Sequence, residues 1–201
     1  MIEVFDFEQG SPEWFDARAA IVTASAMHNV LAKGQGKTRL SYMYKLIGER
    51  ITGEPAASFS NEHTDRGHEH EPIIRNLYQM QKECETQKVG FMRNHADIGY
   101  VGYSPDDYVG NDGLFEAKSK LAHIQAEILD HGEVPSEHKA QLQTGLWVSE
   151  REWIDFVSYC PMFPLFIKRV YRDEKYIANM RAEVISFYDE LELKINKIIN
   201  Y

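Results

Sequence analysis

The sequence has few cysteines and no long apolar run. Its two cysteines, Cys84 and Cys160, lie far apart and form no CxxC pair, so both are expected to be reduced thiols. No run of about 18 apolar residues occurs, which argues against a membrane-spanning helix. The first residues are acidic and lack the basic and apolar regions of a secretory signal. These absences predict a cytoplasmic protein with no membrane partner.

Positive charge is also scarce. The chain has 22 lysines and arginines against 31 aspartates and glutamates, a formal net charge of −9. This balance counts against nucleic-acid binding, because contacts to phosphate groups need Lys and Arg. Residues 33–50 are nevertheless locally basic, with a single acid, Glu49, among Lys33, Lys37, Arg39, Lys45 and Arg50. This basic strip is either a DNA-binding surface or a solvated helix face.

Length and composition are those of one globular domain. The 201 residues, 43% hydrophobic and 26% charged, suffice to bury a sheet between helices. No repeat, low-complexity stretch or linker divides the chain, so residues 1–201 are expected to form a single domain.

Apolar spacing and turn residues predict the order of the elements. Helices are expected from Pro12, from Ser25 to Leu31, and over 39–52, 65–83, 136–148 and 174 onwards. Strands are expected over 99–104, 114–118, 153–159 and 166–171, with a hairpin turn at 111–113. This order predicts an α/β fold with a central mixed β-sheet flanked by helices.

Two carboxylates and a lysine occur at a spacing that can bring them together. Asp106 is followed by Glu116 and then by Lys118. Side chains alternate between faces along a strand, so Glu116 and Lys118 point the same way while Ala117 turns into the core. A hairpin at 111–113 would carry Asp106 back beside Glu116. The three charged groups are therefore expected to converge.

This set suits phosphodiester hydrolysis. Mg²⁺ held by one or two carboxylates keeps sites for water and phosphate. Asp106 and Glu116 would be ligands, with the Ala117 carbonyl as a third, and Lys118 would orient or deprotonate the attacking water. A nearby dication would favour the neutral form of Lys118 and so allow it to act as a base. The alternative is a charged surface hairpin with a salt bridge.

Further motifs accompany this set in one order over residues 9–190. They are Trp14…Arg18, Ile21-Val22-Thr23-Ala24-Ser25, Gly67-x-x-x-Glu71, Ser104-Pro105-Asp106, Glu116-x-Lys118, Ala140-Gln141-Leu142-Gln143 and Arg172-Asp173-Glu174-Lys175-Tyr176. Each motif is weak alone, but the combination is specific. In these motifs the chain resembles the phage lambda exonuclease or YqaJ-type viral recombinase family, within the PD-(D/E)xK nuclease superfamily.

The resemblance implies a restriction-endonuclease-like fold and a Mg²⁺-dependent enzyme, with two ions per site and Mn²⁺ able to substitute. The implied activity is 5′→3′ digestion of one strand of a DNA duplex from a 5′-phosphorylated end. This releases mononucleotides and leaves a 3′ single strand for recombination by strand annealing. The resemblance also implies a ring-shaped homotrimer, a partner single-strand annealing protein, and a phage or prophage gene in a bacterial host.

The same resemblance assigns catalytic roles by position. Asp106, Glu116 and Lys118 match the metal-binding and catalytic core. Glu71 matches a helix carboxylate near the metal ions, usually acting through water. Gln141 matches the glutamine that completes the active-site motif.

Other matches form the pocket that grips the 5′-phosphate, namely Arg18, Ser25 and Ser104. Arg offers a bidentate fork to phosphate, and Ser25 at a helix N-terminus would add a hydroxyl and the helix dipole. Trp14, one turn before Arg18, is a candidate for stacking on DNA, with amphipathic packing as the alternative.

The chain departs from the family pattern in two places. The family often has SPDG, whereas here Asp107 follows Asp106, so a share of Asp107 in metal binding stays open. The loop over 93–97 differs in length, and Asn94 is nearest to the position where some relatives have an acid. Glu71 precedes Pro72 and is expected in the first turn of its helix, where a carboxylate is favoured on structural grounds alone.

Other signals have weaker functional interpretations. Gln143 points away from Gln141 on its helix and is left out of the site. The cluster of His63, His68 and His70 fits no standard zinc spacing, and two cysteines are too few for a four-cysteine iron–sulfur cluster. Apolar residues repeat along the last helix, which packs either on its own sheet or against another subunit, at Val184, Tyr188, Leu191, Ile195 and Ile198.

Two other functions stay open. One is a sequence- or structure-specific endonuclease with the same metal site, against which the phosphate pocket argues, because an enzyme cutting inside a duplex has no end to grip. The other is a non-catalytic DNA-end-binding protein, against which the complete acid–acid–lysine set argues.

Overall fold

The computed structural model describes residues 2–33, 36–56, 62–95 and 99–201, apart from the side chains of 62–65. The side chain of His63 and the end of the loop over 93–97, both mentioned above, therefore lie outside the described part of the structure. Within the described ranges, no helix has the length and apolarity that crossing a bilayer requires.

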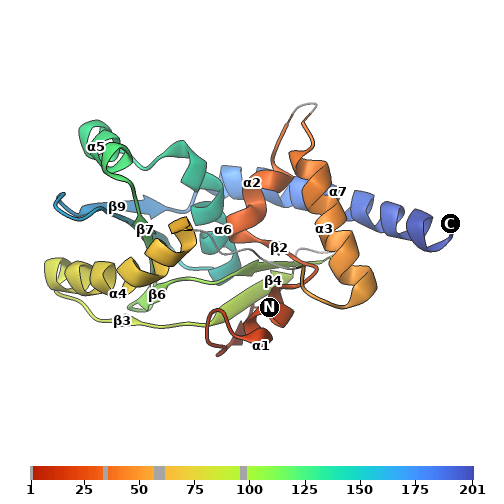
Figure 1. Cartoon of the computed structure of the whole chain (residues 1–201), viewed down its shortest axis with the longest axis horizontal. Helices are drawn as coiled ribbons and strands as arrows, with labels where there is room; N and C mark the ends of the chain where they lie inside the picture. The colour runs from red at the N-terminus through yellow and green to blue at the C-terminus, as the bar shows by residue number, and fades with distance from the viewer. Residues whose placement is uncertain (1, 34–35, 57–61, 96–98) are drawn as a thin grey trace.

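Two mixed β-sheets form the centre of the molecule (Figure 1). The first has the strand order β1-β4-β5-β2, with β1 at Ile2–Phe5, β4 at Phe91–His95, β5 at Tyr100–Tyr103 and β2 at Val22–Thr23. The second has the order β3-β6-β7-β8-β9, with β3 at Thr86–Gln87, β6 at Asp107–Val109, β7 at Gly113–Ser119, β8 at Trp153–Tyr159 and β9 at Phe166–Tyr171. The chain enters the second sheet at β3, returns to the first at β4, and passes to the second again between β5 and β6.

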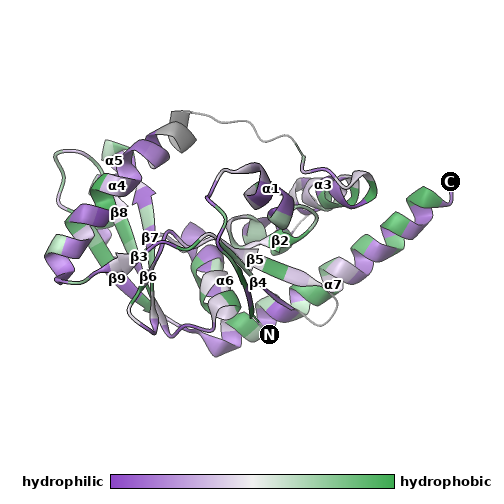
Figure 2. Ribbon diagram, turned by 90° about the horizontal axis from the view of Figure 1, so that it is seen from below, coloured by the Kyte–Doolittle hydropathy of each residue, from purple (hydrophilic) through white to green (hydrophobic). Residues whose placement is uncertain are grey.

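Helices cover both sheets. They are α1 (Pro12–Arg18), α2 (Met27–Val30), α3 (Thr38–Thr52), α4 (Glu62–Lys82), α5 (Ala122–His131), α6 (Lys139–Ser149) and α7 (Glu174–Ile199), with 3₁₀ turns η1 (Ala24–Ala26) and η2 (Ser136–His138). α6 contacts β4, β5 and β8, so it joins the two sheets, while α4 packs on β7 and β8 and α3 packs on α7. Figure 2 shows α7 running past the rest of the molecule, with apolar and polar turns alternating to its C-terminal end.

Successive side chains of β7 point to opposite faces of the sheet, and each face packs in a different hydrophobic cluster. Leu114 belongs to the large cluster that α6 and α7 complete, whereas Phe115 belongs to a smaller cluster with Ile74 and Tyr78 of α4. Ala117 packs against this smaller cluster, as the alternation predicted. Glu116, between them in the sequence, therefore lies on the face toward α6.

The fold class is as expected, a mixed α/β protein, although the strands divide into two sheets. Helices predicted over 39–52, 65–83 and from 174 are confirmed as α3, α4 and α7. The helix expected from Pro12 is also confirmed as α1, and Ser11 caps it, since its Oγ accepts the N–H of Trp14 at 3.2 Å. Sequence patterns gave no indication of β1 to β4, β6 or α5, which are short or lack clear periodicity.

Three local expectations were wrong. The helix expected from Ser25 to Leu31 is broken into η1 and α2, and Ser136 lies inside η2 instead of capping α6. The hairpin does not join 99–104 to 114–118, because β5 belongs to the first sheet and β6 is the strand that pairs with β7. In both places a 3₁₀ turn takes the first residues of the expected α-helix. η1 precedes α2, and η2, which follows Pro135, precedes α6, so each α-helix begins later in the chain than expected.

Candidate active site

The β6–β7 hairpin brings Asp106 beside the segment that carries Glu116. Asp107, the first residue of β6, pairs with Phe115, so Asp106 directly precedes the paired residues and lies next to the continuation of β7 beyond Phe115. Gly110 closes the turn at a φ of 56°, a conformation that favours glycine. Asp106 Oδ2 accepts the backbone N–H of Ala117 at 2.6 Å. The expected approach of Asp106 to this part of β7 is therefore present.

Glu116 is held by three donors from three elements. The residue is only 2% exposed. Its Oε1 accepts hydrogen bonds from Lys118 Nζ at 2.7 Å and from Gln141 Nε2 at 2.6 Å. Its Oε2 accepts a hydrogen bond from the hydroxyl of Tyr103 at 2.9 Å. The structure thus brings Lys118 and Gln141 to Glu116 as the sequence indicated, and adds Tyr103, which sequence reasoning missed.

Tyr103 ends β5 directly before the Ser104-Pro105-Asp106 segment. Burial and the charges of Glu116 and Asp106 raise its pKa well above the usual value, so it stays a protonated donor. A buried aromatic hydroxyl usually has a partner, and its place at a strand end next to Ser104 was the signal available. Tyr103 therefore orients Glu116.

The two carboxylates and the lysine affect one another's charge. Burial, followed by the charge of Glu116, raises the pKa of Asp106 well above its usual value, and Lys118 opposes this only in part. Burial lowers the pKa of Lys118, but Glu116 and Asp106 outweigh it, so the net pKa is raised. With only the protein's own charges around it, Lys118 is thus a cation. Its role as a base was expected only beside a bound dication and stays a prediction.

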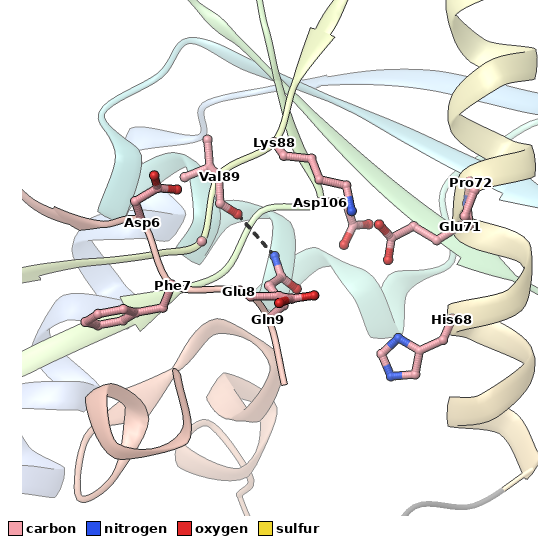
Figure 3. A pocket seen from close by; sticks show the side chains of 11 residues that line it. Asp6, Phe7, Glu8, Gln9, His68, Glu71, Pro72, Lys88, Val89 and Asp106 are labelled. Atoms are coloured by element: carbon pink, nitrogen blue, oxygen red, sulfur yellow. Dashed lines mark hydrogen bonds between the residues drawn. The ribbon is translucent and has the colours of Figure 1, made fainter. Parts of the chain in front are cut away.

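Glu71 reaches this group from α4. It lies in the middle of α4, which begins at Glu62 and contains Pro72, so the first-turn dipole argument for it was wrong. Glu71 and Asp106 line one pocket of about 520 Å³, and the charge of Glu71 helps raise the pKa of Asp106. Figure 3 shows the two carboxylates facing each other, with Lys88 entering from the opposite wall. Lys88 carried no sequence signal.

The donor set fits a hard divalent cation. Among the described residues, no three His, Cys, Asp or Glu side chains converge closely enough to form a cage on their own. Mg²⁺ needs no such cage, because it takes one or two carboxylates and completes its shell with water. Ala117 turns its N–H to Asp106, and in a strand the C=O of that residue lies on the same side. Asp106, Glu116 and the Ala117 carbonyl would therefore be the ligands, and the raised pKa of Asp106 marks an excess of negative charge that a cation relieves.

A second pocket, of about 510 Å³, adjoins the first, and Gln9 and His68 line both. Arg18 lies in it, stacked on Trp14 with the guanidinium carbon 4.0 Å from the ring centroid. Burial lowers the pKa of Arg18 to about 10. No carboxylate of the described residues forms an ion pair with this guanidinium. A buried, unpaired arginine is costly unless an anion joins it, so the pocket suits an anionic group.

Ser104 connects the second pocket to the catalytic segment. Its Oγ accepts Trp14 Nε1 and Arg18 Nη1, each at 2.9 Å. Ser25 lines the pocket, with its Oγ 3.5 Å from Thr23 Oγ1. Because Ser25 lies in the three-residue η1 and not at the start of a regular helix, the expected dipole contribution is not supported.

Residues left open by the sequence have other partners. Asp107 is fully buried and accepts Arg75 Nε at 2.5 Å, so it faces α4. Asn94 donates to Glu150 at 3.4 Å. Gln143 donates to the carbonyl of Tyr171 at 2.8 Å, which leaves Gln141 as the glutamine that reaches the site.

The basic strip is largely neutralised by α7. Arg39 pairs with Glu190 at 2.5 Å, Lys33 with Glu183 at 3.8 Å, and Arg50 with Glu192. Lys45 pairs with Glu49 at 3.2 Å, and both line the second pocket. The strip is therefore mainly an intramolecular contact, apart from Lys45, which lines the second pocket.

Comparisons with known proteins agree on one family. Residues 13–152 match the YqaJ-like viral recombinase domain. The chain is similar to the alkaline exonuclease LHK-Exo from Laribacter hongkongensis, with 34% identity and a TM-score of 0.85 over 94% of this chain and 97% of that one. A structure of LHK-Exo in complex with dAMP gives 36% identity and a TM-score of 0.85 over 94% and 96%. A phage-related exonuclease from Haemophilus somnus 129PT, at 15% identity and a TM-score of 0.63 over 92% and 98%, shares the fold.

No curated protein matched the sequence. The domain match nevertheless spans residues 13–152, which include Arg18, Glu71, Asp106, Lys118 and Gln141. Together with the similarity to LHK-Exo over nearly the whole of both chains, this match shows that the chain belongs to the YqaJ-like viral recombinase family of nucleases.

Proposed function

We propose that this protein is a Mg²⁺-dependent exonuclease that digests one strand of duplex DNA 5′→3′ from a 5′-phosphorylated end. It would release mononucleotides and leave a 3′ single strand for recombination by annealing. The observation that best supports this proposal is that two pockets adjoin each other. One holds Asp106 and Glu71, the other holds Arg18, which has no ion-pair partner among the described residues, and Gln9 and His68 line both.

This adjacency favours an exonuclease over an endonuclease. Arg18 gains an anionic partner only from a group that enters its pocket, and a terminal phosphate brings more charge than an internal phosphodiester. A strand end held there would place its first residues at the neighbouring carboxylates. An enzyme that cuts inside a duplex has no such end to hold.

Each residue of the site has a separate role in the proposed reaction. Mg²⁺, or Mn²⁺ in its place, would polarise the phosphate and supply hydroxide when bound by Asp106, Glu116 and the Ala117 carbonyl, with two ions expected per site. Lys118, as a cation, orients the attacking water and neutralises charge that develops on the phosphate. Gln141 and Tyr103 hold Glu116 in one orientation. Arg18, Ser104 and Ser25 position the strand end, and Trp14 supports Arg18.

A cleavage assay tests the proposal. The protein is incubated with Mg²⁺ and a linear duplex carrying a label at the 5′ end of one strand, with a closed circular duplex as control. Early release of labelled mononucleotide with the circle intact supports a 5′→3′ exonuclease. Nicked or linearised circles indicate an endonuclease. No cleavage with Mg²⁺ or Mn²⁺ leaves a DNA-end-binding protein.

The proposal extends to assembly as a ring-shaped homotrimer and to a single-strand annealing protein as partner. The exposed apolar residues near the end of α7, Leu193, Ile198 and Ile199, support an intermolecular contact there. Sedimentation equilibrium of the purified chain tests the trimer, and a monomer at all concentrations would contradict it. Co-purification with an annealing protein encoded beside it tests the partner.

A further inference from the structure

Arg75 links the metal-site face of α4 to a buried carboxylate on β6. Its Nη2 donates to Glu71 Oε1 at 2.7 Å, one helical turn away, and its Nε donates to Asp107 Oδ2 at 2.5 Å. The Arg75 side chain is only 13% exposed. One planar guanidinium thus holds two carboxylates that belong to different elements.

Asp107 fixes the position of this guanidinium. Asp107 is completely buried, and a buried carboxylate is stable only when it is paired. Its Oδ2 also accepts the hydroxyl of Thr86, whereas its Oδ1 is without a hydrogen-bond partner among the described residues. Arg75 is therefore the cation that compensates Asp107, and it cannot turn away without exposing that charge to the apolar surroundings.

The fixed guanidinium of Arg75 in turn restricts the orientation of Glu71. Because Arg75 holds Oε1, the carboxylate of Glu71 is kept in one orientation and keeps its second oxygen for the pocket that it shares with Asp106. Figure 3 shows the Glu71 carboxylate turned toward Asp106. Without Arg75, Glu71 would rotate freely on α4.

We propose that Arg75 and Asp107 are positioning residues that orient Glu71 for the water shell of the bound cation. Asp107, where the family often has glycine, thus acts through Arg75 and is not itself a ligand. The inference rests on the proposed metal-dependent function. Residues that orient metal-binding carboxylates affect metal affinity even though they do not touch the ion.

The test is Mn²⁺ binding to the free protein, measured by electron paramagnetic resonance without DNA. Arg75→Lys keeps a positive charge for Asp107 but loses the fork that holds both carboxylates. We expect Arg75→Lys to weaken Mn²⁺ binding about tenfold. The same change in a Glu71→Gln background should have less than about a twofold further effect, because coupled residues are not additive.

Two further variants separate positioning from general loss of structure. Arg75→Gln/Asp107→Asn removes the buried charge together with its partner, so folding is preserved, and it should weaken Mn²⁺ binding as Arg75→Lys does. Tyr78→Phe is the matched control. Tyr78 is also buried on α4, and its hydroxyl donates to Asp155 at 2.8 Å; among the described residues, no hydrogen bond joins it to Glu71, Arg75 or Asp107. It should lower the melting temperature and leave Mn²⁺ affinity within about twofold.

The outcomes distinguish this inference from the proposed function. Wild-type binding that Arg75→Lys and the double variant leave unchanged would overturn the positioning role alone. An equal loss in Tyr78→Phe would also overturn it, since the effect would then be structural. Absence of Mn²⁺ binding by the wild-type protein would overturn both the positioning role and the metal-dependent function.

Discussion

Lys118 lies 2.7 Å from Glu116, and the carboxylates around it hold it in the charged form. Replacing it with alanine removes the only cation in direct contact with Glu116 among the described residues. We expect Lys118→Ala to lower the single-turnover cleavage rate about 10²-fold or more, because a positioned charge and proton donor contributes at least this much. Fluorescence anisotropy with an end-labelled duplex should show retained binding. A rate within about tenfold of wild type would remove Lys118 from the mechanism.

Arg18 is expected to set the preference for phosphorylated ends. Hydrogen bonds to a charged group contribute roughly 1.5–3 kcal/mol, so Arg18→Ala should reduce the preference for 5′-phosphate over 5′-hydroxyl ends about 10- to 100-fold. Competition between the two substrates measures this ratio. Arg39→Ala is a matched control, because Arg39 pairs with Glu190 of α7. An unchanged ratio in Arg18→Ala, or an equal change in Arg39→Ala, would contradict the assignment of the pocket.

At this scale, the sequence predicted contacts within one hairpin or one helix turn. Strand alternation placed Glu116 and Lys118 on one face, and helical spacing placed Trp14 beside Arg18. Contacts between elements distant in sequence, such as that of Gln141 with Glu116, were indicated only by the family resemblance. The contact of Tyr103 in β5 with Glu116 and that of Arg75 in α4 with Asp107 depend on tertiary packing, which no local pattern encodes.

α6 is held against β5 at a glycine. A Cβ on Gly145 would lie 2.8 Å from Cζ of Tyr103, the ring whose hydroxyl orients Glu116. We expect Gly145→Ala to force the two elements apart and to destabilise the protein by about 1–3 kcal/mol. Tyr103→Phe, which keeps the ring and loses only the hydroxyl, should reduce cleavage with a smaller loss of stability. Urea unfolding and the cleavage assay measure the two effects.

Gly48 provides the opposite control. It lies in α3, and a Cβ there would meet nothing within 4 Å. Alanine is the better helix former, so Gly48→Ala should stabilise the protein by about 0.5–1 kcal/mol without changing cleavage. Equal destabilisation by both alanine variants would mean that close packing at Gly145 is not the cause.

The elements that could be predicted were the long ones. α3, α4 and α7 each extend over several turns, so their apolar periodicity was readable. β2 and β3 have two residues each and β6 has three, too few for a period-2 pattern. These short strands nevertheless divide the strands into two sheets and set the register that brings Asp106 to β7. The approach of Asp106 to β7 could therefore be predicted, whereas the division of the strands into two sheets could not.

Charge is distributed over the whole molecule in two separate ways. The excess of acids is used in part by α7, whose glutamates pair with cations of the basic strip. Other acids gather at the site, where Glu116 pairs with Lys118, Glu71 pairs with Arg75, and Asp106 has no ion pair among the described residues. The net charge of −9 therefore does not by itself argue against DNA binding, because it does not say which charges are already paired.

This concentration of carboxylates should make stability depend on Mg²⁺ and on pH. The pKa of Asp106 is raised on folding, so the folded state binds its proton more tightly than the unfolded state does. Stability without metal should therefore fall as the pH rises above about 4, the ordinary pKa of aspartate, toward the raised folded value.

Asp106→Asn removes this ionisation. Without metal at neutral pH, the variant should be more stable than wild type, because it carries no buried negative charge at this position. Mg²⁺ at 100 times its dissociation constant should stabilise the wild-type protein by about 2.7 kcal/mol and the variant much less. Thermal melts in EDTA and in Mg²⁺ measure both differences. If Asp106→Asn were less stable than wild type in EDTA, or gained as much from Mg²⁺, the buried carboxylate would not be the source of the metal dependence, and Asp106 would lose its place as a ligand.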